Sequence, residues 1–241
     1  MNHYVLKSFA TDDALAQAAA SAWVDEVAQA ECAGKTFTVA LSGGRIARKF
    51  YSGIVTQASR QDLRLIHTHF FWADERCVPP DDAESNFALA RECLFTPLGT
   101  ASGNIHRVLG EESPDFAATE AEAEISRIAD LSADGLPMLD LVILGLGEDG
   151  HVASLFPGAP QIVTDSRHSY LPISGSPKPP ANRVTLSYAA LATARRVWVL
   201  ASGSGKAAAL QRSLNSTDGT PLARVINSRK ETWLFSDLPA F

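Results

Sequence analysis

Hydrophobic and polar positions along the chain follow two alternating patterns. Short runs rich in β-branched and aromatic residues predict strands at 4–9, 37–41, 65–72, 139–144, 169–173, 183–186, 197–201 and 232–235. Alanine-rich stretches with apolar residues at helical spacing predict helices at 12–33, from 45 onward, and at 85–94, 114–131 and 205–214. The run at 139–144 is almost continuously apolar, which is typical of a strand buried on both faces.

This alternation predicts an α/β fold, a doubly wound, mostly parallel sheet with helices on both faces and a few additional strands. No internal repeat or low-complexity linker divides the chain, so we expect a single domain over residues 1–241. In such folds, ligands bind beyond the carboxyl ends of the strands. The informative loops are therefore those after Leu41, Trp72, Leu144 and Ala201.

Composition and charge narrow the class of protein. The chain is 46% hydrophobic and 20% charged, as expected for a globular protein, and its net charge of −6 disfavours a nucleic-acid binder. No stretch approaches the length of a membrane span and the N-terminus has no secretory pattern, so we expect neither membrane insertion nor export. Three scattered cysteines without a CxxC motif favour a reduced, cytoplasmic protein. An anionic ligand would need cations gathered from distant parts of the chain.

Two glycine-containing loops follow predicted strands. Ser42-Gly43-Gly44 precedes a helix, where successive backbone N–H groups favour an anion and Arg45 adds charge, although a tight turn explains the same residues. The loop GLGEDG at 145–150 matches the dinucleotide pattern GxGxxG. Its mid-chain position and two acids count against a pyrophosphate, and Pro157 limits a following helix. A dinucleotide site is therefore disfavoured, and no GxxxxGKS/T phosphate loop occurs.

His151 comes directly after this second loop, with Asp149 two residues before it. A histidine in a loop at a strand end can act as a general base near neutral pH. A lone histidine is more often structural, so the interpretation depends on its position in the loop. The spacing makes Asp149 a candidate for orienting the imidazole.

Four cations stand in predicted loops at strand edges of this acidic chain, namely Arg45, Arg76, Arg183 and Lys206. Arg76 belongs to Asp74-Glu75-Arg76, which is either a loop ion pair or an arginine that binds an oxyanion while the acids orient it. Taken singly, Lys206 and Arg183 do not indicate a binding site, because lysine and arginine side chains are usually solvated. Together the four cations favour an anionic ligand.

Other motifs add less. His67 and His69 share one face of a predicted strand, but no third ligand stands at suitable spacing, so no metal site is expected. Asn86 opens the helix after Asp74-Glu75-Arg76 and is interpreted as a helix cap. No GxSxG motif supports a serine hydrolase. These residues therefore add neither metal chemistry nor a nucleophilic serine.

Four segments, taken together, resemble one known family. They are ALSGG at 40–44, FFWADERCVPPDDAESNFALAREC at 70–93, LDLVILGLGEDGHVASLFPG at 139–158 and PKPPANRVTLSYAALATARRVWVLASGSGKA at 177–207. In order and spacing they are similar to the glucosamine-6-phosphate isomerase/6-phosphogluconolactonase family, and they cover nearly the whole chain. Ala73-Asp74-Glu75-Arg76 and the SLFPG segment at 154–158 favour the lactonase branch over the deaminase branch.

The resemblance implies the glucosamine-6-phosphate deaminase-like fold and hydrolysis of 6-phospho-D-glucono-1,5-lactone to 6-phosphogluconate in the oxidative pentose phosphate pathway. It implies no cofactor and no metal, and a small sugar-phosphate lactone as partner rather than nucleic acid or membrane; we expect a monomer. By position, His151 would be the general base and Arg183 would help bind substrate. The phosphate would be held by Ser42, Gly43, Gly44, Arg76 and Lys206.

The chain departs from the family pattern where Arg45-Ile46-Ala47 follows the two glycines, in place of a hydroxyl residue and proline. Arg45 either replaces the lost phosphate contact or points into solvent. Two other functions stay open. A deaminase or aldose–ketose isomerase acting on a hexose 6-phosphate would release ammonia or isomerise its substrate, and a sugar-phosphate sensor would bind without turnover.

Overall fold

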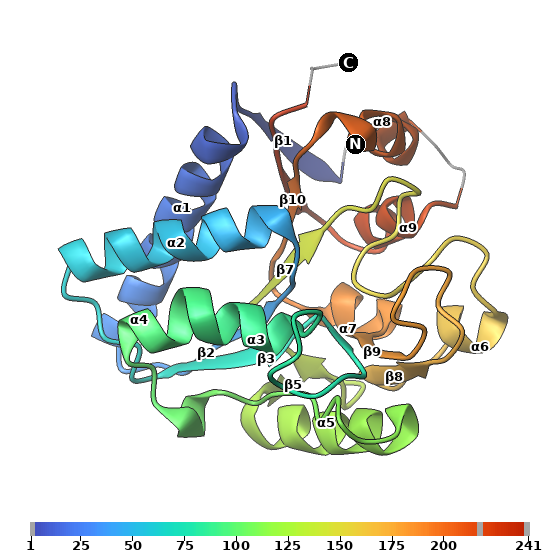
Figure 1. Ribbon diagram of the computed structural model, residues 1–241, viewed down its shortest axis with the longest axis horizontal. Coiled ribbons are helices and arrows are strands. Elements are labelled where there is room, and N and C mark those ends of the chain that lie inside the picture. The colour runs from blue at the N-terminus through green and yellow to red at the C-terminus, as the bar shows by residue number, and fades with distance from the viewer. Residues whose placement is uncertain (1–2, 216–218, 239–241) are drawn as a thin grey trace.

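The computed structural model describes residues 3–215 and 219–238. Its main sheet has the order β1-β11-β10-β7-β2-β3, and every neighbouring pair is parallel (Figure 1). These strands are β1 (Tyr4–Ser8), β2 (Phe37–Leu41), β3 (Thr68–Trp72), β7 (Leu141–Gly145), β10 (Val197–Ala201) and β11 (Thr232–Ser236). All five residues of β2 are buried, as a central parallel strand requires.

Smaller antiparallel sheets and short helices complete the molecule. One small sheet has the order β4-β9-β8, from β4 (Asp74–Arg76), β8 (Tyr170–Ile173) and β9 (Arg183–Leu186), and the other pairs β5 (Asp130–Leu131) with β6 (Pro137–Met138). The α-helices are α1 (Asp12–Cys32), α2 (Arg45–Arg60), α3 (Asn86–Ala90), α4 (Thr96–Leu98), α5 (Pro114–Ile128), α6 (Gln161–Thr164), α7 (Tyr188–Thr193), α8 (Ala207–Asn215) and α9 (Pro221–Asn227). A π-helical turn, Arg91–Phe95, joins α3 to α4.

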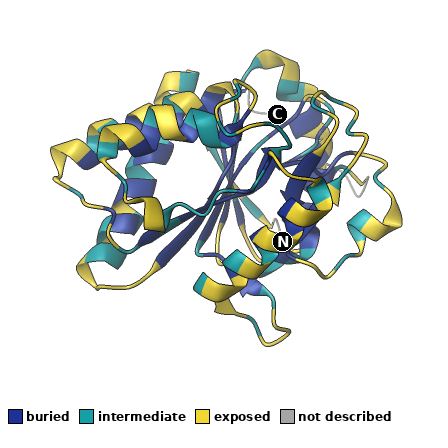
Figure 2. Cartoon of the chain, turned by 60° about the horizontal axis from the view of Figure 1, so that its bottom comes forward, coloured by how far each residue is buried: buried dark blue, intermediate teal, exposed yellow. Residues whose placement is uncertain are grey.

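Helices cover both faces of the main sheet. Figure 2 shows the buried strands running between two groups of helices whose outer faces are exposed. The long helix α1 begins at Thr11, whose hydroxyl accepts a hydrogen bond from the N–H of Ala14 at 3.1 Å, and two aspartates follow in its first turn. It packs along α2, while α8 and α9 pack on each other elsewhere in the fold. The predicted α/β class is confirmed.

The order of the main sheet reverses between β2 and β7. The chain continues outward from β2 to β3 on one side, and from β7 through β10 to β11 on the other. Where the order reverses, the loops at the carboxyl ends turn away from one another and leave a crevice in which α/β proteins bind ligands. This arrangement positions the site described below.

Several local predictions were wrong. Asp74–Arg76, expected in a loop, is strand β4, because it pairs with β9 about a hundred residues away. The helix expected at 85–94 is α3 followed by the π-helical turn. The helix expected at 114–131 ends at Ile128, and one face of it is buried against β8. The strand expected from residue 65 begins at Thr68, and α6, α7 and α9 were not expected.

The two histidines of the predicted strand at 65–72 have separate surroundings. His69 Nδ1 lies 2.8 Å from His106 Nε2, and His106 Nδ1 lies 2.6 Å from Glu124 Oε1, so this chain of hydrogen bonds joins β3 to α5. The backbone N–H of His67 instead donates to Glu31 of α1 at 2.9 Å. Over residues 3–215 and 219–238, no group of three or more His, Cys, Asp and Glu side chains is arranged to hold a metal ion. In the same residues, no helix is both long and apolar enough to cross a membrane.

Candidate active site

A cavity of about 460 Å³ opens beyond the carboxyl ends of β2 and β7. Segments that follow β2, β3, β7 and β10 all contribute to its walls, although the residues after β3 come from strand β4 and the start of α3 rather than from the predicted loop. Eight of the nine predicted site residues line it, namely Ser42, Gly43, Gly44, Arg45, Arg76, His151, Arg183 and Lys206. The ninth, Asp149, hydrogen-bonds His151. The fold therefore brings all the predicted residues to one place.

The loop after β2 forms the first wall. Gly44 has φ 103°, a conformation that favours glycine, and caps the start of α2. Ser42 Oγ donates to the carbonyl of Ile143 at 2.8 Å, and Tyr51 Oη donates to the carbonyl of Ser42 at 2.6 Å. The Ser42 hydroxyl thus ties β2 to β7 in this structure. The first backbone N–H groups of a helix such as α2 have no acceptor within the helix, so they can donate to an anion.

Two arginines stand opposite each other on a second wall. Arg76 of β4 and Arg183 of β9 are directly paired in the antiparallel register. Like charges at such positions repel, so their pairing on a cavity wall favours an anionic occupant. Arg76 Nη1 donates to the carbonyl of Glu84 at 2.5 Å, and about a quarter of its side chain is exposed. Arg183 is almost completely buried, and burial lowers its pKa although Asp74 opposes the effect.

The sequence named Glu75 among the acids that could orient Arg76, but it did not indicate how Glu75 and Asn86 hold this wall. The Glu75 carboxylate accepts hydrogen bonds from the N–H groups of Arg76 at 2.7 Å and Asn86 at 2.8 Å, and so joins β4 to the start of α3. Burial raises the pKa of Glu75 to about 7, although these hydrogen bonds favour the carboxylate. The interpretation of Asn86 as a helix cap was wrong, because Ser85 caps α3 by accepting from the N–H of Ala88 at 3.1 Å.

Asn86 instead lines the cavity. Its Nδ2 donates to the carbonyl of Asp74 at 2.8 Å, and its Oδ1 lies 1.8 Å from where a Cβ on Gly43 would stand. Gly43 is therefore required for this close approach, which joins the loop after β2 to the loop after β4. No feature of the local sequence indicates such a contact between residues more than forty positions apart.

His151 and Asp149 form a hydrogen-bonded pair. His151 Nδ1 lies 2.5 Å from Asp149 Oδ1, and the imidazole packs on the ring of Phe156 with centroids 4.7 Å apart. Burial lowers the pKa of His151 from its ordinary value, and Asp149 only partly opposes this. Burial alone would raise the pKa of Asp149, but its interactions with His151 and Lys178 lower it. Both shifts favour a carboxylate and an unprotonated imidazole, the forms that a general base needs.

Lys206 stands on the loop after β10. Asp237 holds this loop, accepting from Ser202 Oγ at 2.8 Å. Burial lowers the pKa of Lys206, and the nearby charge of Arg45 lowers it further. Arg45 Nη2 lies 3.8 Å from where a Cβ on Gly203 would stand, so its guanidinium is turned across the cavity towards the Lys206 loop. Arg45 thus lines the cavity while its side chain is also exposed to solvent, and its contact with a phosphate stays a prediction.

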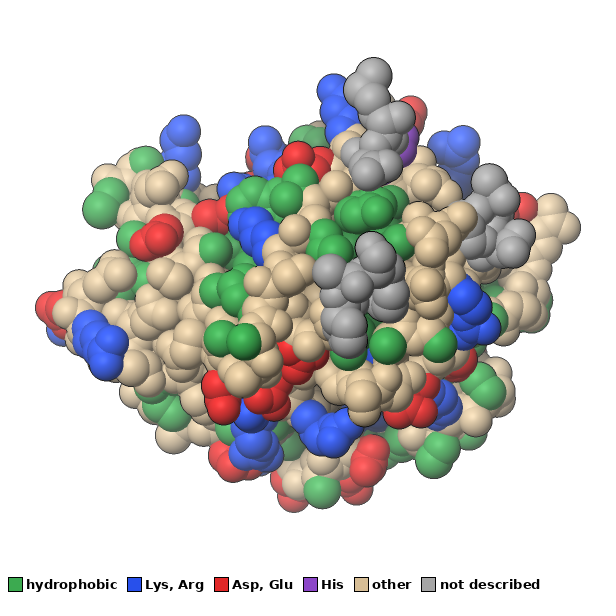
Figure 3. Space-filling model, turned by 90° about the horizontal axis from the view of Figure 1, so that it is seen from above, with side chains coloured by type: hydrophobic (Ala, Val, Ile, Leu, Met, Phe, Trp, Pro, Cys, Tyr) green, Lys and Arg blue, Asp and Glu red, His purple; other side chains and the backbone are tan. Residues whose placement is uncertain are grey.

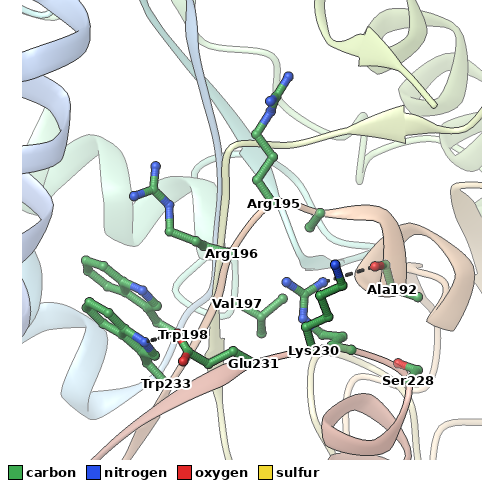
Figure 4. A pocket seen from close by; sticks show the side chains of 11 residues that line it. Ala192, Arg195, Arg196, Val197, Trp198, Ser228, Lys230, Glu231 and Trp233 are labelled. Carbon is green, nitrogen blue, oxygen red and sulfur yellow. Dashed lines mark hydrogen bonds between the residues drawn. The ribbon is translucent and has the colours of Figure 1, made fainter. Parts of the chain in front are cut away.

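A second hollow, of about 360 Å³, lies at the opposite ends of β10 and β11 (Figure 4). Two of the arginines that line it already have carboxylate partners: Arg195 lies 2.8 Å from Asp130, and Arg196 lies 2.7 Å from Glu26. None of the predicted site residues lines this hollow. On the face seen from above in Figure 3, basic and acidic side chains are interspersed.

Fold and site together define a doubly wound α/β protein with a histidine–carboxylate pair in a cationic cavity at its strand ends. The chain belongs to the glucosamine-6-phosphate isomerase/6-phosphogluconolactonase family, whose model matches residues 10–234. The family and the fold predicted from the sequence are confirmed.

Individual relatives agree with this membership. A 6-phosphogluconolactonase of Mycobacterium tuberculosis is 31% identical over 236 residues, which cover 95% of this chain and 94% of that one. A chloroplastic 6-phosphogluconolactonase 3 of Arabidopsis thaliana is 33% identical over 210 residues, 85% of this chain, and this chain spans 64% of that relative's length. The solved structure of 6-phosphogluconolactonase from Trypanosoma cruzi matches with a TM-score of 0.84 at 25% identity, covering 98% of this chain and 96% of that one.

Proposed function

We propose that this protein is a carboxylic ester hydrolase that converts 6-phospho-D-glucono-1,5-lactone to 6-phosphogluconate. One observation carries the proposal: His151, hydrogen-bonded to Asp149, shares a cavity with Arg45, Arg76 and Lys206. A general base suits water addition to an ester, and the cations suit the phosphate of the substrate. The lactonase names of the relatives supply the identity of the sugar acid.

In the proposed reaction, His151 acts first as a base and then as an acid. With Nδ1–H held by Asp149, Nε2 removes a proton from a water molecule while the water oxygen bonds to the lactone carbonyl carbon. The tetrahedral oxyanion is stabilised by cations of the cavity. When it collapses, the bond from this carbon to the ring oxygen breaks, and the imidazolium gives its proton to that oxygen. A strained cyclic ester needs no nucleophilic side chain for these steps.

The phosphate is proposed to lie between the start of α2 and the two cationic loops. Backbone N–H groups after Gly44, the Arg76 guanidinium and the Lys206 ammonium would surround it, with Arg45 at the edge. Arg183 is proposed to act less directly. Its Nη2 and Nε donate to the carbonyls of Pro179 at 2.9 Å and Pro180 at 3.1 Å, so most of the guanidinium holds the neighbouring loop.

The direct test is lactone hydrolysis at mildly acidic pH, where the spontaneous reaction is slow. The lactone is generated in the cuvette and its loss is followed with and without the protein. Acceleration in proportion to protein concentration is the expected result. Tight binding of 6-phosphogluconate without acceleration would point to a sensor, and ammonia release from glucosamine 6-phosphate would point to a deaminase; either outcome overturns the proposal.

Replacing Lys206 with methionine is expected to raise KM for the phosphorylated lactone about tenfold with little change in kcat. One hydrogen bond to a charged group contributes about 1.5 kcal/mol, and the other cations stay in place. Unphosphorylated gluconolactone should show no such change. Lys230→Met, on an exposed residue of the second hollow, is the matched control. An equal loss with both lactones would remove Lys206 from the phosphate site.

A further inference from the structure

Lys178 lies beside the His151–Asp149 pair, on the loop between β8 and β9. Its Nζ is 3.7 Å from Asp149 Oδ1, the same oxygen that hydrogen-bonds His151 Nδ1 at 2.5 Å. One carboxylate oxygen is therefore shared between an ammonium and an imidazole. Lys178, Asp149 and His151 therefore form one connected group of three titratable side chains. Lys178 has no role in the reaction described above.

The fold holds the backbone of Lys178 in place. Arg183 Nη2 donates to the carbonyl of Lys178 at 3.3 Å, and Ser176 Oγ donates to the same carbonyl at 2.9 Å. Arg183 itself is 4% exposed, and its Nη1 lies 3.8 Å from Asp74 Oδ2. A buried arginine, anchored by a buried carboxylate, thus fixes the loop from which Lys178 reaches into the cavity. The Lys178 side chain itself is 43% exposed.

The charged groups around His151 have opposing effects on the protonation of its imidazole. Asp149 and, more weakly, Asp74 favour the imidazolium, whereas the charge of Lys178 disfavours it. Arg183 lies behind the Phe156 ring on which the imidazole packs, with its Cζ 5.7 Å from the ring centroid. Across the cavity, Lys178 also acts on Lys206, whose positive charge it disfavours. Lys178 therefore acts electrostatically on both the proposed base and the proposed phosphate site.

We propose that Lys178 is a positioning residue, which holds Asp149 in place and keeps His151 unprotonated until the reaction delivers a proton to it. The proposal rests on the lactonase mechanism above. A cation near His151 makes the imidazole a weaker base but the imidazolium a stronger acid, so Lys178 favours return of the proton to the departing ring oxygen. It also extends the pH range in which the free base is present towards acidic values.

The test compares Lys178→Met with Lys178→Arg. In the methionine variant we expect the pKa of His151 to rise by about half a pH unit, as for removal of one partly screened charge near the surface. Proton NMR of the histidine ring in the free protein measures this without any substrate, with the His151→Ala spectrum assigning the signal. The acidic limb of the pH profile of kcat/KM should move to higher pH by the same amount. At a fixed pH on that limb, kcat/KM should therefore fall about threefold. Lys178→Arg should restore both, and Lys230→Met should change neither.

The outcomes separate the two proposals. An unchanged His151 titration in Lys178→Met overturns the role of Lys178, whatever the activity. A shifted His151 titration with an unshifted acidic limb of kcat/KM also overturns it. In that case Lys178 would change the pKa of a histidine whose protonation does not limit the reaction. If the wild-type protein shows no lactonase activity, the proposed function fails on its own assay, and the NMR titration still reports whether Lys178 controls the protonation of His151.

Discussion

Replacing His151 with alanine is expected to lower kcat for lactone hydrolysis by about two to four orders of magnitude, the usual contribution of a general base. The substitution leaves Asp149 and the cationic side chains of the cavity in place, so binding of 6-phosphogluconate should be retained. His151 is held against Asp149 and Phe156 rather than exposed, and its removal takes away the atom that we propose receives the proton from water. Steady-state kinetics and product-binding calorimetry on the same sample measure both effects.

The matched control is His168→Ala, because His168 is 78% exposed and lies outside the cavity lining. That variant should retain the wild-type rate. Wild-type activity should fall as the pH drops through the lowered pKa of His151, because protonation removes the free base. A rate within a few fold of wild type for His151→Ala would take this residue out of the chemistry and shift attention to water activated by another group.

The main sheet could be predicted because each strand carries its own signal. The run at β7 is apolar throughout and the run at β2 is apolar except for Thr38, and burial on both faces leaves few other structures for them. β4 has no such signal, since its three residues are polar and form a strand only by pairing with β9. The short helices α7 and α9 have six and seven residues, too few to show a helical period in the sequence.

The site could be predicted in part for a similar reason. His151 and Lys206 follow strongly apolar strands, so the fold class alone places them at the strand ends. Glu75 acts through hydrogen bonds to the nearby residues 76 and 85–87, whereas Asn86 and Lys178 act through contacts with residues far away in the sequence. Asn86 packs on Gly43, and Lys178 reaches Asp149 from a different loop. Such contacts depend on how loops from separate strands meet, which no local pattern describes.

Gly147→Ala is expected to lower kcat by about a hundredfold. A Cβ at this position would stand 2.0 Å from His151 Nδ1 and 2.7 Å from Asp149 Oδ1, so the pair must move. The backbone N–H of Gly147 also donates to the carbonyl of His151 at 2.9 Å, which limits how far the loop can open. Displacing a catalytic group by about 1 Å costs on the order of a hundredfold in rate. The phosphate site is separate, so KM should change little.

The glycine at 147 therefore has a different purpose from the second glycine of a dinucleotide loop, whose pattern this segment shares. It leaves room for the side chains of His151 and Asp149 rather than for a pyrophosphate. Gly103→Ala is the control, because a Cβ there meets nothing within 4 Å and Gly103 lies outside the cavity lining. Both variants should melt close to wild type, so a selective fall in kcat for Gly147→Ala isolates the position of His151. Full kcat in that variant would mean that hydrolysis does not depend on the geometry of the His151–Asp149 pair.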